Sequence, residues 1–319
     1  MKKLIIKLIP IIDITLSPFV LVSAIVLKLV RRLGLSKVRL SRSILLRVGV
    51  LPINDHYYEP LFHPKHLFKP LSDDRHLPGI NLNTNEQLSI LDTFDFNSEI
   101  IEIPDDYVDN LTFHFKNGSF ESGDADYWYN LIRIKKPKTI IEIGSGHSTK
   151  MAQLAIRKNK QNNENYVCNH ICIEPYEMPW LEKLNDIQVL RKKVESVDID
   201  FFKKLNENDI LFIDSSHIIR PQGDVLFEFL EILPTLNKGV IVHIHDIFTP
   251  KDYLEEWVTK HHKLWNEQYL LEAFLTSNSQ WSIIGALNYL KNNHFEALKN
   301  KCPKLDQSRE PGSFYIQKI

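Results

Sequence analysis

The chain has 319 residues, of which 43% are hydrophobic, and its formal net charge is −1. This length allows one large α/β core with appended segments, and three cysteines exclude a disulfide framework. The small net charge hides an asymmetry, because residues 1–47 contain ten Lys or Arg and a single acid, Asp13. A basic arm on an acidic body suits nucleic acid or an anionic membrane. The Leu, Ile and Val content of residues 4–29 favours an anionic membrane surface and excludes nucleic acid as the partner.

The arm, residues 1–48, is predicted to be helical and membrane-associated. Its uncharged part, residues 14–27, would cover about 21 Å as a helix against roughly 30 Å of hydrocarbon. Lys or Arg flank it on both sides, so the charges give no direction of insertion. Pro18 predicts a bend, and residues 35–48 alternate basic and apolar side chains as an interfacial helix does. We predict monotopic attachment through residues 4–48 to the cytoplasmic face of the cell membrane, with a single-pass span or a signal peptide as the alternatives.

Residues 49–119 predict an irregular cap that binds substrate. Repeated prolines interrupt any long element, and one helix is expected at about residues 85–91. Residues 113–120 are expected to form a small strand or a turn. Polar and aromatic side chains suited to a sugar-like acceptor follow one another at His56, Tyr57, Tyr58 and Glu59. The alternative is that these four residues only anchor the cap to the sheet.

From residue 120 to residue 319, apolar runs alternate with helical stretches, which predicts an α/β domain. Strands are expected at residues 139–143, 171–173, 187–190, 210–214, 239–244, 281–287 and 312–316. Helices are expected at residues 124–134, 149–158, 177–185, 198–205, 222–233, 267–276 and 288–300. Strands that are apolar on both faces are typical of a sheet covered by helices on both sides. The predicted fold is therefore a Rossmann-like α/β sheet of seven strands.

The run from Thr139 to Ser148 predicts a nucleotide-cofactor turn. An apolar strand ends there, and Gly144 and Gly146 then lead into a helix whose N-terminus faces the same point. A dinucleotide-binding site typically has a third glycine three residues after the second, and this chain has Thr149 at that position. Glu142 places a negative charge where pyrophosphate would lie, but it suits a cofactor with an ammonium and a sulfonium. The run therefore favours S-adenosylmethionine over NAD.

With this turn the chain resembles the class I S-adenosylmethionine-dependent methyltransferases, whose first motif is an acid, x, Gly, x, Gly at a strand end. The resemblance covers residues 120–319 and implies a seven-stranded sheet whose last strand inserts antiparallel. Ser148 stands where a third glycine often follows in that family. The residues implied to hold the cofactor lie in the first turn and at later strand ends: Glu142, Gly144, Ser145, Gly146, His147, Ser148, Glu174, Ser196 and Asp214.

Two further strings, IDSSH ending at His217 and HIHD ending at Asp246, place acids and imidazoles at two strand ends. Their side chains should converge at one edge of the sheet, where they suit Mg²⁺ or Mn²⁺ rather than a closed zinc site. The strings resemble the metal-dependent sugar O-methyltransferases of macrolide biosynthesis and the related cephalosporin-hydroxylase-like group. That resemblance implies a metal held by Asp214, His245 and Asp246, and His217 as the general base. His245 departs from the group's acidic pair, and the alternative is that these residues merely cap strands.

The predicted function is O-methylation of a saccharide or lipid-linked glycan hydroxyl in polysaccharide biosynthesis, with S-adenosylmethionine as donor. The expected partners are a saccharide or glycolipid acceptor and an anionic membrane surface, and the sequence leaves a homo-oligomer open. One alternative is an NAD-dependent sugar oxidoreductase or epimerase, against which the absence of a Tyr-x-x-x-Lys pair argues. The other is a non-catalytic membrane adaptor, against which the joint presence of Glu174, Asp214 and His217 argues.

Overall fold

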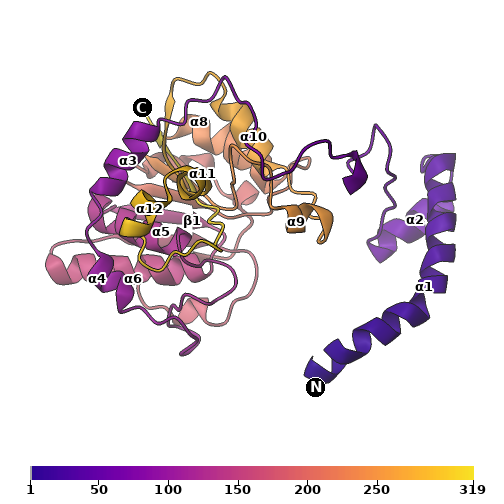
Figure 1. Cartoon of the computed structure of the whole chain (residues 1–319), viewed down its shortest axis with the longest axis horizontal. Coiled ribbons are helices and arrows are strands. Elements are labelled where there is room, and N and C mark those ends of the chain that lie inside the picture. Colours follow the sequence, from indigo (N-terminus) through magenta and orange to yellow (C-terminus); the bar gives the residue numbers. More distant parts are fainter. Residues whose placement is uncertain (1) are drawn as a thin grey trace. The chain divides into compact units, whose positions relative to one another are not determined.

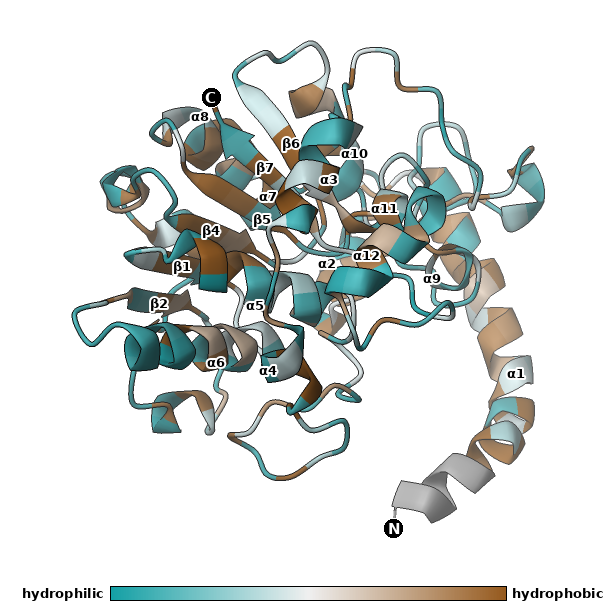
Figure 2. Ribbon diagram, turned by 60° about the vertical axis from the view of Figure 1, so that its left-hand side comes forward, coloured by the Kyte–Doolittle hydropathy of each residue, from teal (hydrophilic) through white to brown (hydrophobic). Residues whose placement is uncertain are grey.

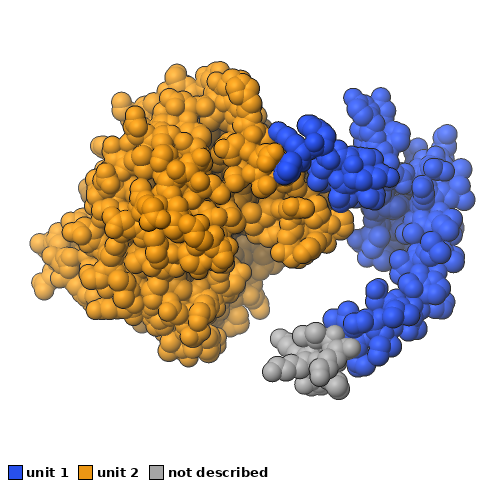
Figure 3. Space-filling model, in the orientation of Figure 1, with its two compact units in different colours: residues 1–70 blue, residues 71–319 orange. Residues whose placement is uncertain are grey.

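In the computed structural model the chain divides into two units, residues 1–70 and residues 71–319, which Figure 3 colours separately. The structure describes the backbone of residues 2–319 and the side chains of residues 8–319. The side chains of Lys2, Lys3 and Lys7, part of the predicted basic flank, lie outside the described residues. The predicted cap does not form a unit of its own, because residues 71–119 belong with the sheet. Leu91, Phe94 and Ile100 of that stretch are buried in its core, which explains the difference.

The first unit consists of α1 (Lys2–Leu33), α2 (Arg39–Val48) and a short 3₁₀ helix, Pro64–His66. Figure 1 shows that α1 is bent, and it contains Pro10 and Pro18. Pro18 has no N–H for the carbonyl of Ile14, and the Ser17 hydroxyl donates to that oxygen instead at 2.9 Å. By length and composition, Leu8–Leu33 is long and apolar enough to cross a membrane.

The second unit is built on a seven-stranded sheet with the strand order β3-β2-β1-β4-β5-β7-β6. Its strands are β1 (Thr139–Ile143), β2 (Asn169–Ile173), β3 (Gln188–Leu190), β4 (Ile210–Ile213), β5 (Ile241–Ile244), β6 (Trp281–Ala286) and β7 (Phe314–Lys318). β7 pairs antiparallel with both β5 and β6, whereas the other pairs are parallel. The expectation of a mixed sheet with an inserted antiparallel strand is confirmed.

Helices cover both faces of this sheet. They are α3 (Thr84–Asp92), α4 (Asn97–Ile101), α5 (Asp124–Lys135), α6 (His147–Asn162), α7 (Asp224–Phe227), α8 (Leu233–Thr235), α9 (Glu255–Thr259), α10 (Glu267–Leu275), α11 (Leu287–Asn293) and α12 (Phe295–Lys301). Because side chains alternate along a strand, Ile140 packs on the α5 and α6 side, and Ile141 packs on the α7 and α10 side. Figure 2 shows the apolar residues along β4 and β5 between these layers.

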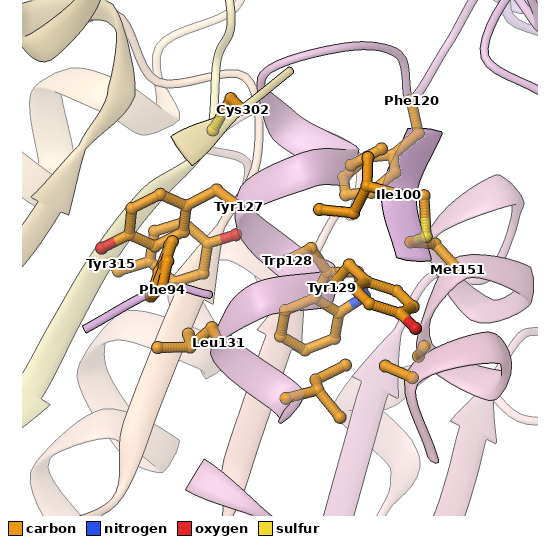
Figure 4. Packing of buried hydrophobic residues seen from close by; sticks show 14 of the residues in the cluster. Phe94, Ile100, Phe120, Tyr127, Trp128, Tyr129, Leu131, Met151, Cys302 and Tyr315 are labelled. Carbon is orange, nitrogen blue, oxygen red and sulfur yellow. The ribbon is translucent and has the colours of Figure 1, made fainter. Parts of the chain in front are cut away.

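The core on the α5 side is rich in aromatic residues. Tyr127 of α5 lies with its ring centroid 4.8 Å from that of Phe94 and 4.7 Å from that of Tyr315 (Figure 4). Trp128 is fully buried, and its indole N–H donates to the carbonyl of Ser148 at 3.2 Å. Burying aromatic side chains of this size contributes on the order of 2–3 kcal/mol each, so α5 and the start of α6 are held firmly against the sheet.

Some predicted elements differ from the structure. The helix expected at residues 177–185 is only a 3₁₀ turn, Leu181–Lys183, and Pro179 disfavours a helical backbone at Met178 before it. The helix expected at residues 222–233 contains a π-helical turn, Glu228–Ile232, between α7 and α8. The helix expected at residues 288–300 is interrupted at His294. Of the two alternatives for residues 113–120, a small strand or a turn, the strand does not form, and the segment is a series of bends.

His170 and Glu142 form an enclosed pair between β2 and β1, with His170 Nε2 3.4 Å from Glu142 Oε2. Burial lowers the pKa of His170, but Cys172 and Glu142 outweigh it and raise this pKa to about 10. Because the pKa of His170 is raised, the contribution of this pair to the free energy of unfolding is fully present below the ordinary histidine pKa of 6.5. That contribution is lost as the pH rises to about 10. His170→Gln should therefore lower the free energy of unfolding near neutral pH by about 3 kcal/mol.

Denaturant unfolding of wild type and His170→Gln at a series of pH values tests this pair. The difference in unfolding free energy between the two proteins should shrink between about pH 7 and pH 10. A constant difference over that window would show that the pair is not ionised in the folded protein.

Candidate active site

The register of the sheet brings the ends of four parallel strands to one edge. Ile143 pairs with Ile173 on one side and with Ile213 on the other, and Ile213 pairs with Ile244. The next residues are therefore level with one another: Gly144, Glu174, Asp214 and His245. The chain runs outward from β1 to β3 and then returns to β4, so this edge is also the point where the strand order reverses. Open α/β sheets bind their ligands at such a point.

The turn after β1 crosses very close to the end of β4. Gly144 has φ +80°, and a Cβ atom built on it would lie 2.0 Å from the carbonyl oxygen of Asp214. Only glycine fits this position. Gly146 is different, because its φ of −173° is extended and a Cβ there would meet nothing within 4 Å. The first glycine serves the fold, and the second leaves open space in front of the N-terminus of α6.

Two cavities meet at the edge of the sheet. Cavity A has a volume of about 210 Å³ and is lined by Ile143, Gly144, Ile173, Glu174, Pro175, Tyr176, Lys193, Val194, Glu195, Asp214, Ser215, Ser216, Arg220 and Asp224. Cavity B has a volume of about 480 Å³ and is lined by Gly118, Ser119, Phe120, Ser145, Gly146, His147, Ser148, Met178, Trp180, Asp214, His245, Asp246, Trp257 and Lys263. Asp214 lines both cavities, so it stands where a ligand in one could react with a ligand in the other.

Acidic groups line cavity A at its β2 end. Glu174 is 6% exposed, and its carboxylate accepts hydrogen bonds from the backbone N–H groups of Ser145 at 3.3 Å and Tyr176 at 2.9 Å. Glu195 reaches the same cavity from the segment after β3. A carboxylate at the end of the second strand is suited to bind vicinal hydroxyls such as those of a ribose.

His217 lies at the centre of a group of carboxylates. Its Nδ1 is 2.7 Å from Glu267 Oε2, and its Nε2 is 3.2 Å from Asp214 Oδ1 and 3.7 Å from Asp246 Oδ2. The Nδ1–H therefore donates to Glu267, which leaves Nε2 facing Asp214, the residue that lines both cavities. Burial lowers the pKa of His217, but hydrogen bonds with Asp214 and Glu267 outweigh it and hold this pKa well above its ordinary value.

His245 is the second imidazole of the site. Its Nδ1 lies 3.6 Å from both Asp214 Oδ1 and Asp246 Oδ1, and its Nε2 lies 4.0 Å from Asp124 Oδ2. Burial lowers the pKa of His245, but Asp246, Asp214 and Asp124 outweigh it and raise this pKa to about 10. His243, two residues earlier, is a core residue that hydrogen-bonds Ser313 at 2.8 Å.

The donors present at this edge suit a divalent cation. Ligand atoms of Asp214, His217 and Asp246 all lie within 4.8 Å of one another. His245 Nδ1 is buried and has no hydrogen-bond partner among the described residues, although two carboxylates lie 3.6 Å away. Carboxylate oxygens with imidazole nitrogen fit Mg²⁺ or Mn²⁺. Asp214, His245 and Asp246 would then be the ligands, because His217 cannot act as a base while its Nε2 binds a metal.

The other predicted site residues fall into three groups. Ser145, Gly146, His147 and Ser148 line cavity B, and Gly144, Glu174 and Asp214 line cavity A. Glu142 lines neither cavity, because its strand position points it under α6, where it accepts a hydrogen bond from Thr149. Ser196 also lies outside both linings, and its hydroxyl donates to the Lys193 carbonyl at 2.7 Å. His56, Tyr57, Tyr58 and Glu59 belong to the first unit, where Glu59 pairs with Arg31 at 2.7 Å, so their substrate role stays a prediction.

Several site residues have no signal in the sequence. Glu267 was expected only as the start of a helix, yet it is fully buried against His217. Asp124 likewise begins α5 and is brought to His245 by the packing of that helix. Trp257 and Lys263 line cavity B from a segment more than ten residues after β5. Only the tertiary structure joins these residues to the strand ends.

Comparison with known proteins agrees with this geometry. The family model described as a methyltransferase domain matches residues 141–247, which include the glycine turn and both strings. An uncharacterized protein of Archaeoglobus fulgidus is 30% identical over 176 residues, which make up 51% of this chain and 77% of that protein. The chain belongs to the methyltransferase domain family. The predicted class I methyltransferase is thereby confirmed. The matched residues include the strand ends that meet at the edge of the sheet.

Solved structures similar to the methyltransferase include an O-methyltransferase from Bacillus cereus in complex with S-adenosylhomocysteine. It is 11% identical, the match covers 74% of this chain and 91% of that one, and the TM-score is 0.36. A second is CalS11, a TDP-rhamnose 3′-O-methyltransferase of calicheamicin biosynthesis. It is 12% identical, with 60% of this chain and 76% of that one covered and a TM-score of 0.34.

Proposed function

We propose that the protein transfers a methyl group from S-adenosylmethionine to a hydroxyl of a saccharide or lipid-linked glycan. The observation that carries the proposal is the position of Asp214, which lines both cavities 3.2 Å from the imidazole of His217. A cofactor in cavity A and the adjoining glycine turn, and an acceptor in the rest of cavity B, would meet at this residue. The resemblance of the IDSSH and HIHD strings to sugar O-methyltransferases supports a sugar hydroxyl as the acceptor.

The groups that line cavity A and the adjoining turn support binding of the cofactor there. Glu174 is placed for ribose hydroxyls, and Glu195 lies farther along the same cavity. Gly146 leaves open space, and Ser145 Oγ and His147 Nδ1 are buried without a hydrogen-bond partner among the described residues. Burial lowers the pKa of His147 to about 4, so it would meet the cofactor as a neutral imidazole. These unpaired polar groups in front of α6 are available to bind the carboxylate in the methionine part of S-adenosylmethionine.

A sugar hydroxyl is a poor nucleophile until a base removes its proton. Glu267 holds the Nδ1–H of His217, so Nε2 of the neutral imidazole is the atom that accepts this proton. Because the carboxylates raise the pKa of His217, transfer should become faster as the pH rises. The methyl carbon leaves the sulfonium sulfur and bonds to the hydroxyl oxygen, which gives a methyl ether, S-adenosylhomocysteine and protonated His217. A divalent metal on Asp214, His245 and Asp246 would lower the pKa of the bound hydroxyl.

Calorimetric titration of the full chain with S-adenosylmethionine and, separately, with NAD tests the proposal. We expect saturable binding of S-adenosylmethionine and none of NAD, because the turn lacks the third glycine of a dinucleotide site. Failure to bind S-adenosylmethionine would overturn the proposal, and binding of NAD alone would favour the oxidoreductase. Transfer of labelled methyl to fractionated glycans, with and without EDTA, then identifies the acceptor class and any need for a metal.

We further propose that the first unit attaches the enzyme to the cytoplasmic face of the membrane. Large apolar side chains of α1 are exposed within this unit, including Ile14 at 74% and Phe19 at 71%. The hydroxyls of Thr15 and Ser17 bond carbonyls of their own helix, so the polar groups around Pro18 need no water. α2 adds exposed Leu40 and Ile44 beside basic residues, as an interfacial helix does. A full-length protein that stays soluble without detergent would contradict this attachment.

A further inference from the structure

A lysine held between two tryptophans lies on the wall of cavity B. Lys263 Nζ is 3.7 Å from the ring centroid of Trp257 and 3.8 Å from that of Trp265. The two indole rings lie 5.2 Å apart, nearly perpendicular to each other at 77°. The backbone N–H of Lys263 donates to the Trp257 carbonyl at 2.9 Å, which closes the segment into a compact turn. The ammonium is therefore positioned by rings and backbone together.

Among the described side chains this ammonium forms no ion pair, and the charge of Asp246 acts on it only at longer range. Across the described side chains, residues 8–319, no carboxylate oxygen lies within 4.0 Å of Lys263 Nζ. Contact with two indole faces stabilises the charge and costs the long side chain much of its rotamer freedom. A lysine that is held in this way on a cavity wall is positioned to bind the anionic group of a ligand.

The same segment leads directly to the proposed base. The Trp265 ring lies against His217, tilted by 38°, with 4.2 Å between the ring centroids. The next two residues, Asn266 and Glu267, donate their backbone N–H groups to the His217 carbonyl, and the Glu267 carboxylate holds the imidazole. The Trp265 ring therefore contacts both the ammonium of Lys263 and the imidazole that would deprotonate the acceptor. A group bound at Lys263 would lie near the reacting hydroxyl.

We propose that Lys263, with Trp257 and Trp265, binds a phosphate or carboxylate of the acceptor and so selects anionic sugars. This inference rests on the proposed function and names its substrate class. Asp214 and Asp246 line cavity B and repel an anion, and Lys263 is the one Lys or Arg in that lining, so the anionic group of an acceptor would bind at Lys263. Trp257 and Trp180 also line the cavity and offer apolar faces to a sugar ring.

The experiment is calorimetric titration of the full chain, saturated with S-adenosylhomocysteine, with glucose, glucuronate and glucose 1-phosphate. Both anionic sugars, or one of them, should bind at least tenfold more tightly than glucose, because a charge-assisted hydrogen bond contributes about that factor or more. Comparing glucuronate with glucose 1-phosphate tells whether the anion is a carboxylate or a phosphate. No preference over glucose, including no binding of any sugar, would overturn the inference.

Three variants separate the charge from the shape of the site. Lys263→Met keeps a long apolar side chain between the indoles and should lose the anionic preference, whereas Lys263→Arg should retain it. Lys260→Met is the matched control, because Lys260 lies three residues earlier, is 71% exposed and pairs with Glu256 on the surface. An anionic preference that persists in Lys263→Met would also overturn the inference. Binding of S-adenosylhomocysteine is measured first in every variant. A protein that does not bind it would contradict the proposed function, whereas a protein that binds it but shows no anionic preference would contradict only the role of Lys263.

Discussion

Replacing His217 with asparagine is expected to slow methyl transfer by about 10²–10⁴-fold, the usual contribution of a general base. Asparagine is the appropriate replacement because His217 has φ +60°, a backbone conformation that asparagine adopts more readily than alanine. The affinity for S-adenosylmethionine should be unchanged, since His217 does not line cavity A, where the cofactor is placed. Single-turnover transfer of labelled methyl gives the rate, and calorimetry gives the affinity.

The control for His217 is His261→Ala, which removes an exposed histidine from the segment after α9. A His217→Asn protein with the wild-type transfer rate would exclude His217 as the base. Glu267→Gln tests the positioning of the imidazole, because glutamine keeps the shape but loses the carboxylate that accepts the Nδ1–H. Its transfer rate should fall by about 10–100-fold, with a shifted pH profile and an unchanged KM for the cofactor.

Gly144→Ala is expected to lower the free energy of unfolding by about 2–4 kcal/mol and to abolish methyl transfer. The added Cβ would lie 2.0 Å from the Asp214 carbonyl oxygen, and the φ of +80° is strained for alanine. The ends of β1 and β4 must move apart to relieve the contact, which also displaces the Asp214 side chain from His217. Urea unfolding and the transfer assay measure the two effects.

Gly146→Ala is the matched control for Gly144→Ala, two residues away in the same turn. Its backbone is extended and its Cβ would meet nothing within 4 Å, so the unfolding free energy should stay within about 1 kcal/mol of wild type. The methyl group would enter the open space before α6, and the affinity for S-adenosylmethionine should fall about tenfold or more. Equal destabilisation by the two substitutions would contradict the separate roles given to these glycines.

The sequence predicts the frame of the site well, for a local reason. Strands that are apolar on both faces and end in Gly144, Glu174, Asp214 or His245 predict a parallel sheet with those residues at one edge. Parallel pairing with Ile143, Ile173, Ile213 and Ile244 in register then brings them level. Boundaries are less certain where proline or a π-helical turn interrupts a helical pattern, as in residues 177–185 and 222–233.

The sequence does not predict which carboxylates contact the imidazoles of His217 and His245. Glu267 and Asp124 look like ordinary acids in the first turn of a helix, where the helix dipole favours them. No spacing in the sequence joins Glu267 to His217 or Asp124 to His245, and these contacts exist because α10 and α5 pack on particular strands. The assignment of Glu142 to the cofactor also depended on its direction, which only the packing of α6 fixes.

By itself, the sequence determined the α/β class, the glycine turn, the convergence of acids and imidazoles at one sheet edge, and the apolar basic arm. These follow from local composition and from the alternation of side chains along strands. Only the tertiary structure decided that Asp214 lines two cavities, that Glu267 holds His217, and that Lys263 lies between Trp257 and Trp265. Such contacts join residues far apart in the chain, and their distances are set by how helices settle on the sheet.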